Sequence, residues 1–157
     1  MKQKRQEWGI KVSNQPGFMA SLSADPSKIK IAIIKAKFNY DITEEMETLA
    51  IERLKELGVT NISSYEVPGS FEIPYAAKKV IKNYDGAIVI GCLIKGETNH
   101  YEYISQGVTL AIQNVISETE KPIIFCVLTV QNIYQAKERI KSATTYAENA
   151  VEIICNF

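Results

Sequence analysis

Apolar residues along the chain follow two alternating patterns, one typical of buried strands and one typical of amphipathic helices. Four short runs, rich in β-branched residues, predict strands of a parallel sheet that are buried on both faces. These runs span Ile29–Ala36, Ile62–Val67, Asp85–Leu93 and Ile123–Thr129.

Helical spacing of apolar residues follows each of these strands. After the first strand, Asp41 and Glu44 have the spacing of a capping box, and Gly58 is placed to end that helix. Pro74 is suited to the first turn of a second helix. A third helix is predicted over Tyr101–Ser117, and a last one from Ile133 towards Ile154 with a break near 142–145.

Strands that alternate with helices predict an α/β domain over residues 29–157, with a parallel sheet covered by helices on both faces. Residues 1–28 read as a separate N-terminal arm with several turn-forming residues, within which Trp8–Val12 has the character of a short strand. Two interpretations of the arm stay open. It is either a disordered tail or a segment that packs on its own domain or on a neighbouring subunit.

Composition narrows the classes of partner. Eighteen basic and eighteen acidic side chains cancel in the 157 residues, so the chain has no general attraction for nucleic acid or an anionic membrane. No apolar run approaches the roughly 20 residues that span a bilayer. Cys92, Cys126 and Cys155 are widely spaced in apolar runs, which argues against a metal site and favours the reducing cytoplasm. The basic arm leaves an organellar transit peptide as an alternative.

Unusual chemistry is concentrated where the predicted strands end. After the third strand, Gly96 allows close backbone approach, and Thr98 and the N–H groups of the next helix favour an anion the size of phosphate. His100 is the one histidine of the chain and suits proton transfer. The alternative is a simple capping box between Asn99 and Glu102, with a histidine that only faces solvent.

Two aromatic residues, a carboxylate and an arginine extend this set. Phe71 is placed to stack on a planar heterocycle and Glu72 to accept hydrogen bonds from ring N–H groups, while Phe38 directly follows the first strand. Arg139 is suited to a bidentate phosphate contact. Taken singly, each has a plainer interpretation: core packing for both aromatic rings, turn formation around Glu72, and a solvated surface pair for Arg139 with Glu138.

Together these residues resemble the lumazine synthase family from about Lys28 to Arg139. Four ordered blocks at the expected separations make the resemblance specific. The blocks are Lys37-Phe38-Asn39, Val67 to Pro74, Gly91 to Tyr103, and Val127-Leu128-Thr129 with Gln135-Ala136 and Glu138-Arg139.

The resemblance implies a flavodoxin-like, three-layer αβα sandwich with a four-stranded parallel sheet, to which the arm could add a strand. It also implies pentamers with active sites between subunits, which in some members form a 60-subunit shell. The implied reaction condenses 5-amino-6-(D-ribitylamino)uracil with 3,4-dihydroxy-2-butanone 4-phosphate, by imine formation, phosphate loss, ring closure and dehydration. It needs no cofactor or metal.

Carried over by position, the resemblance assigns His100 to proton transfer and assigns further residues to two substrates. The residues implied to contact the pyrimidine and its ribityl chain are Phe38, Ser70, Phe71, Glu72, Cys92, Leu93, Ile94 and Phe125, the last from a neighbouring subunit. The residues implied to hold phosphate are Gly96, Glu97, Thr98 and a neighbour's Arg139.

The segment after Arg139 departs from the family pattern. It is several residues shorter than usual and has no lysine where the family places one for phosphate, although Lys141 is nearby. Glu148 is the candidate for the acidic partner of His100. Two alternatives follow from this departure: a family member that serves as an assembly scaffold or flavin-binding protein, and a related enzyme that condenses a different pyrimidine.

Overall fold

The computed structural model describes residues 22–157; the predicted strand at Trp8–Val12 lies outside them. Three short 3-10 helices, η3 (Pro26–Lys28), η4 (Ser70–Glu72) and η5 (Ile81–Asn83), separate some of the longer elements. Those longer elements are β1 (Lys30–Ala36), α1 (Tyr40–Glu56), β2 (Asn61–Val67), α2 (Ile73–Val80), β3 (Gly86–Ile94), α3 (His100–Thr119), β4 (Ile123–Val130), α4 (Ile133–Arg139) and α5 (Ser142–Asn156).

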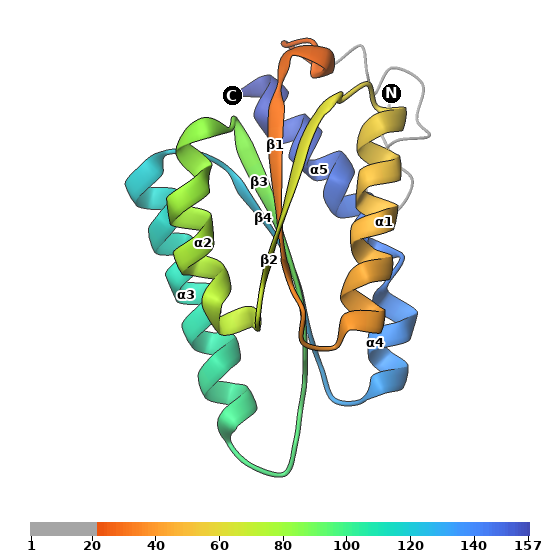
Figure 1. Ribbon diagram of the computed structural model, residues 1–157, viewed down its shortest axis with the longest axis vertical. Helices are drawn as coiled ribbons and strands as arrows, with labels where there is room; N and C mark the ends of the chain where they lie inside the picture. The colour runs from red at the N-terminus through yellow and green to blue at the C-terminus, as the bar shows by residue number, and fades with distance from the viewer. Residues whose placement is uncertain (1–21) are drawn as a thin grey trace, which may run out of the picture.

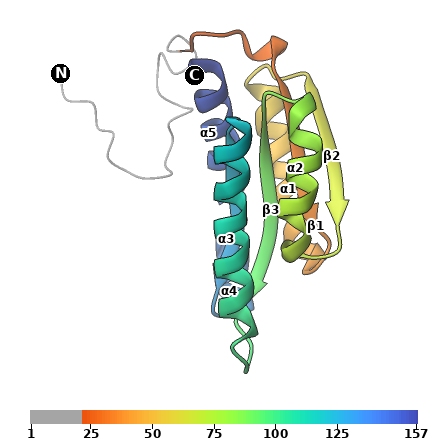
Figure 2. The same ribbon diagram turned by 90° about the vertical axis from the view of Figure 1, so that its left-hand side faces the viewer.

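The four strands form one parallel sheet in the order β2-β1-β3-β4, which confirms the predicted fold class. Helices α1, α4 and α5 cover one face of the sheet, and α2 and α3 cover the other, so the domain has three layers (Figures 1 and 2). Because successive side chains of a strand point to opposite faces, Ile31 and Ile33 pack under α1 while Ala32 and Ile34 pack under α2. Burial on both faces explains the nearly continuous apolar runs.

The predicted capping box at the start of α1 is wrong. The helix begins two residues earlier than a cap at Asp41 predicts, at Tyr40, and its N-cap is Asn39 in the left-handed conformation with φ of 59°. Asp41 lies within the first turn, where its charge still interacts favourably with the helix dipole. At the other end, Gly58 has φ of 96° and its N–H donates to the Lys55 carbonyl, as expected for a glycine that ends a helix.

The predicted break in the C-terminal helix is present, two residues before the predicted position. Helix α4 ends at Arg139 and α5 begins at Ser142, whose hydroxyl donates to the Arg139 carbonyl over 2.6 Å. This bond gives an acceptor at the end of α4 a partner, so the chain can change direction without leaving that carbonyl unpaired.

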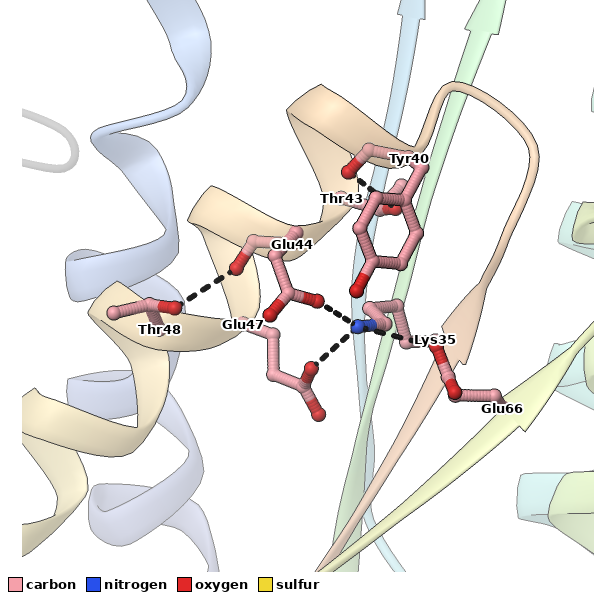
Figure 3. A network of polar contacts seen from close by, with 7 residues as sticks. All are labelled: Lys35, Tyr40, Thr43, Glu44, Glu47, Thr48 and Glu66. Carbon is pink, nitrogen blue, oxygen red and sulfur yellow. Dashed lines mark hydrogen bonds and ion pairs between the residues drawn. The ribbon is translucent and has the colours of Figure 1, made fainter.

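A buried lysine fixes the start of α1 against the sheet (Figure 3). The Lys35 side chain on β1 is only 3% exposed, and its ammonium contacts Glu44 and Glu47 on α1 and Glu66 on β2, the latter two over 2.7 and 3.4 Å. The ammonium also lies 4.9 Å from the centre of the Tyr40 ring. One cation therefore holds together two strands and the helix that follows.

The ion pair between Lys35 and Glu44 keeps both side chains charged. Burial by itself lowers the pKa of Lys35, but hydrogen bonds to Glu44 and Glu47 outweigh burial and raise it above the ordinary lysine value. The Lys35 ammonium and the Tyr40 hydroxyl lower the pKa of the Glu44 carboxyl. Since the folded pKa of Glu44 lies below its unfolded value, this stabilisation is complete above the ordinary carboxyl pKa and is lost as pH falls through the folded value.

We expect Lys35→Met to lower the free energy of unfolding near neutral pH by about 2–3 kcal/mol, because Glu47 is left nearly buried without a cation. The difference from the wild type should shrink between about pH 5 and about pH 3, as the carboxylates take up protons. Urea denaturation across this range measures both effects. Lys30→Met, at an exposed position of the same strand, is the control. A difference that stays constant down to about pH 3 would contradict the assignment.

Candidate active site

The predicted site residues gather at the edge of the sheet where the parallel strands end. The chain leaves β1 for α1 on one face and leaves β3 for α3 on the other, although β1 and β3 are neighbours. The connections therefore diverge at this point, which is the topological switch point of the sheet, and we call the region between the two strand ends the crevice. Doubly wound sheets bind ligands at such a position.

Three hydrogen bonds tie the loops of this edge together. The N–H of Lys37 donates to the Val67 carbonyl over 2.8 Å, and the N–H of Phe38 donates to the Pro68 carbonyl over 3.1 Å. The Asn39 side-chain amide donates to the Cys92 carbonyl over 2.8 Å. The loop after β1 is thus bonded to the ends of both neighbouring strands. Asn39 was missed as a holding residue, because nothing in the local sequence identifies a carbonyl 53 residues away as its partner.

Both aromatic side chains of the predicted site are exposed, Phe38 to 67% and Phe71 to 64%. The plainer interpretation of each as a core residue is therefore wrong. Large exposed aromatic rings beside a crevice are costly to hydrate and offer flat surfaces for stacking on a ligand.

The turn after β2 is held in shape by Glu72. One carboxylate oxygen, Oε2, accepts the N–H of Gly69 over 2.9 Å, and the N–H of Glu72 donates to the Gly69 carbonyl over 3.2 Å. The other oxygen takes part in no hydrogen bond within residues 22–157. Ser70, in the same turn, is only 4% exposed. Glu72 therefore shapes the turn and still has acceptor capacity for a ligand.

The last residues of β3 present backbone more than side chain to the crevice. The Cys92 side chain is 1% exposed and packs in the core beneath α1, and its carbonyl is the one that Asn39 contacts. Burial raises the pKa of the Cys92 thiol to about 11, so it is protonated at neutral pH. Leu93 and Ile94 are partly buried and pack towards opposite faces of the sheet.

The turn that leads into α3 is exposed from Lys95 to His100. Asn99 makes no side-chain capping bond, and Glu102 contacts the Lys95 ammonium over 3.3 Å, so the alternative of a capping box is wrong. The N–H of His100 donates to the Thr98 hydroxyl over 3.3 Å. Helix α3 therefore begins with its dipole end open to solvent and little side-chain capping, an arrangement that favours an anion.

Two predicted residues do not join this group within one chain. Phe125 pairs with Val89 in the middle of the sheet, well before the strand ends. Arg139 ends α4, which packs on the face opposite α3, and its guanidinium donates to the Gln135 carbonyl over 3.2 Å. One chain thus brings together the three loops of the crevice but leaves Phe125 and Arg139 apart from them.

Glu148 is not the acidic partner of His100. It is 3% exposed on α5, and its carboxylate accepts a hydrogen bond from the Arg53 guanidinium on α1 over 3.1 Å. It lies in the layer opposite α3. Its role is to hold α1 and α5 together.

The described residues hold few other candidates for chemistry. Cys92, Cys126 and Cys155 are all buried and free. Within residues 22–157, no three His, Cys, Asp or Glu side chains are grouped as a metal site would require. In the same part of the chain, no helix is long and apolar enough to cross a membrane.

Fold and site together define a doubly wound α/β protein with an exposed, sparsely capped helix start and two exposed aromatic rings at the edge where its strands end. A family profile described as 6,7-dimethyl-8-ribityllumazine synthase matches residues 28–157, so the chain belongs to this family. Its activity is that of lumazine synthase, a transferase of riboflavin biosynthesis.

Curated relatives carry the same description. The 6,7-dimethyl-8-ribityllumazine synthase of Lactiplantibacillus plantarum is 42% identical over 132 residues, which cover 80% of this chain and 83% of that protein. The protein of the same name from Coxiella burnetii is 39% identical over 137 residues, covering 82% and 91%. The one from Limosilactobacillus reuteri is 40% identical over 112 residues, covering 70% and 74%.

We expect Asn39→Ala to destabilise the protein by about 1 kcal/mol more than Asn39→Gly, because only the alanine strains the left-handed conformation. Both variants lose the bond to the Cys92 carbonyl, so their difference isolates the backbone contribution. Urea denaturation of the two variants and the wild type measures it. Equal stability of the two variants would show that φ at this position is not constrained.

Proposed function

We propose that the protein joins 5-amino-6-(D-ribitylamino)uracil to 3,4-dihydroxy-2-butanone 4-phosphate in the crevice between the ends of β1 and β3. The observation that carries this proposal is the loop after β1, which is bonded to the turn after β2 and to Cys92 near the end of β3. Two exposed aromatic rings therefore lie at the same edge of the sheet as the sparsely capped start of α3. Planar rings suit the pyrimidine, and the helix start suits the phosphate.

The pyrimidine binds between the loops after β1 and β2. Phe38 stacks on the ring and Phe71 closes the pocket beside it, since both side chains are exposed at this edge. Glu72 accepts hydrogen bonds from the substrate with the carboxylate oxygen that the turn leaves free, and Ser70 contacts the ribityl chain. Cys92, Leu93 and Ile94 line the slot mainly through their backbone.

The phosphate binds at the turn into α3. The backbone of Gly96 and Glu97 and the hydroxyl of Thr98 lie at the positive end of the helix dipole, where the residues are exposed. An added Cβ at Gly96 would meet no heavy atom within 4 Å, so the space beside it is open. Lys95 is already paired with Glu102, and a guanidinium from outside this turn supplies the remaining positive charge.

His100 moves protons between the steps. The 5-amino group adds to the ketone carbon of the butanone phosphate, and loss of water gives an imine. A proton then leaves the hydroxyl-bearing carbon beside the imine as phosphate departs from the next carbon, and the resulting enol takes up a proton to become a methyl ketone. The ribitylamino nitrogen attacks this ketone, and loss of a second water completes the ring. His100 is exposed beside the phosphate turn, where a neutral imidazole accepts a proton and returns it in a later step. Holding both substrates in register supplies much of the remaining acceleration.

Phe125 and Arg139 reach this crevice from a neighbouring subunit. Within one chain both lie away from it, Phe125 in the middle of β4 and Arg139 on the opposite face of the sheet. A head-to-tail ring brings such distant surfaces together in every interface, which favours cyclic pentamers with shared sites. Such pentamers would serve in the cytoplasm and could assemble further into a 60-subunit shell.

We expect His100→Ala to lower kcat by about 100-fold without abolishing turnover, because the substrates are still held in register. The appearance of lumazine absorbance and the release of phosphate measure the rate. Tyr103→Phe, on an exposed residue of the same helix, is the control. A rate equal to the wild type would remove His100 from the mechanism.

We expect Arg139→Ala to raise KM for the butanone phosphate by about 10-fold or more, and KM for the pyrimidine much less, because a charged hydrogen bond to phosphate is lost. Initial rates with each substrate varied in turn measure the two constants. Lys137→Ala, which removes another cation from α4, is the control. An unchanged KM for the phosphate substrate would refute the assignment.

The same two variants test the shared site. When His100→Ala and Arg139→Ala subunits are unfolded, mixed in equal amounts and reassembled, about a quarter of the interfaces should combine one intact His100 with one intact Arg139. With the butanone phosphate kept well below its KM, activity above that of either parent is therefore expected. If the mixed particles recover no activity, then either both residues act in a site formed by a single chain or neither residue acts in the site.

A further inference from the structure

Gly91 lies where the turn after β2 rests on β3. It is buried, and it pairs with Val127 on the neighbouring strand. A Cβ added at Gly91 would lie 2.5 Å from the Ser70 hydroxyl oxygen, 3.4 Å from a Val127 methyl carbon and 3.5 Å from a methyl carbon of Ile73. Only the contact with Ser70 is shorter than packed atoms tolerate. The missing side chain thus makes room specifically for Ser70.

The backbone conformation at Gly91 does not itself require glycine. Its φ lies outside the left-handed range, in contrast to Gly58 with φ of 96°. Alanine would ordinarily strengthen a strand at such a position, since glycine adds flexibility and no packing. The constraint at Gly91 is therefore the space that η4 occupies and not the course of β3.

The turn that rests on Gly91 carries two of the proposed pyrimidine contacts. Ser70 and Ile73 are buried at 4% and 0% exposure, while Phe71 and Glu72 between them are exposed. The two buried residues anchor the turn, and the two exposed residues take their positions from that anchoring. A shift of Ser70 away from β3 would move Phe71 and Glu72 with it.

We propose that Gly91 is a positioning residue for the pyrimidine substrate, setting the distance between the η4 turn and the end of β3. This rests on the proposed roles of Phe71 and Glu72. The Cys92 backbone lines one side of the proposed pyrimidine slot and follows Gly91 directly along β3, and the η4 turn lines the opposite side. The contact of Ser70 with Gly91 therefore sets the width of the slot. The three heavy atoms nearest to an added Cβ at Gly91 belong to Ser70, Val127 and Ile73, and none of them lies in the phosphate turn at Gly96–Thr98.

The test is a double-mutant cycle between positions 91 and 70. Gly91→Ala should raise KM for the ribitylaminopyrimidine by about tenfold, as a methyl group forced into packed surroundings displaces the turn. KM for the butanone phosphate should change less than about twofold, because none of the three heavy atoms nearest to the added methyl group belongs to the phosphate turn. Ser70 can avoid the methyl group only by rotating into packed surroundings or by moving the turn.

Ser70→Ala removes the atom that would clash and leaves the added methyl group at ordinary packing distances. Ser70→Ala by itself changes the pyrimidine KM. When Gly91→Ala is added to the Ser70→Ala protein, the pyrimidine KM should change further by less than about twofold. Gly107→Ala on α3, where an added Cβ meets no heavy atom within 4 Å, is the control for a glycine replacement and should leave both KM values unchanged.

Each other outcome overturns the proposal. A pyrimidine KM that Gly91→Ala leaves within about twofold of wild type shows that Ser70 rotates freely. Equal losses for both substrates with no relief by Ser70→Ala show a general structural defect. If Phe71→Ala and Glu72→Gln leave the pyrimidine KM unchanged, the proposed site itself fails. The double-mutant cycle can also be measured in the thermal midpoint, where it shows whether positions 91 and 70 are coupled even if the proposed site fails. Failure of the proposed site is therefore distinguishable from failure of the role given to Gly91.

Discussion

The parallel pairing of β1 with β3 is the interaction on which the rest of the structure depends. It places Ile31 opposite Gly86 and Lys35 opposite Ile90 in the centre of the sheet, so that both strands are covered on both faces and end at one edge. The chain leaves the two strands towards opposite faces, which opens the crevice between them. The Asn39 amide then spans that opening to the Cys92 carbonyl. Core and site are therefore held by the same pair of strands.

The charges available to a ligand at this edge depend on burial and ion pairing more than on the net charge of the chain. The Lys35 ammonium on β1 is taken up by three carboxylates beneath the Tyr40 ring, and Lys95 is paired with Glu102. Neither Lys35 nor Lys95 is free to neutralise a phosphate, whereas Lys37 in the loop after β1 is exposed. Arg139 lies on the other face of the chain, so its proposed role at the phosphate rests on the proposed sharing of the site between subunits.

Periodicity and turn residues were enough to predict the four strands, their parallel direction and the break before α5. Burial on both faces leaves an apolar signature in each strand. The same reasoning failed at Asp41, since Asn39 takes the cap position in a conformation stabilised by a carbonyl 53 residues away. The candidate that came with the family resemblance, Glu148, failed for a similar reason, because it is paired with Arg53 across 95 residues. Local sequence carries no record of such distant partners, whereas the loops of the crevice were predictable because parallel strands end together.

The burial of Cys92 has a consequence for the chemistry beside it. A ketone and the imine made from it are electrophiles, and a thiolate at the edge of the proposed slot would compete with the intended amine. With a pKa of about 11, about one Cys92 thiol in ten thousand is ionised at neutral pH, and its sulfur faces the core beneath α1. The fold therefore protects the thiol, so that a nucleophilic sulfur atom lies near the reactive carbon atoms of the proposed substrate without forming an adduct with them.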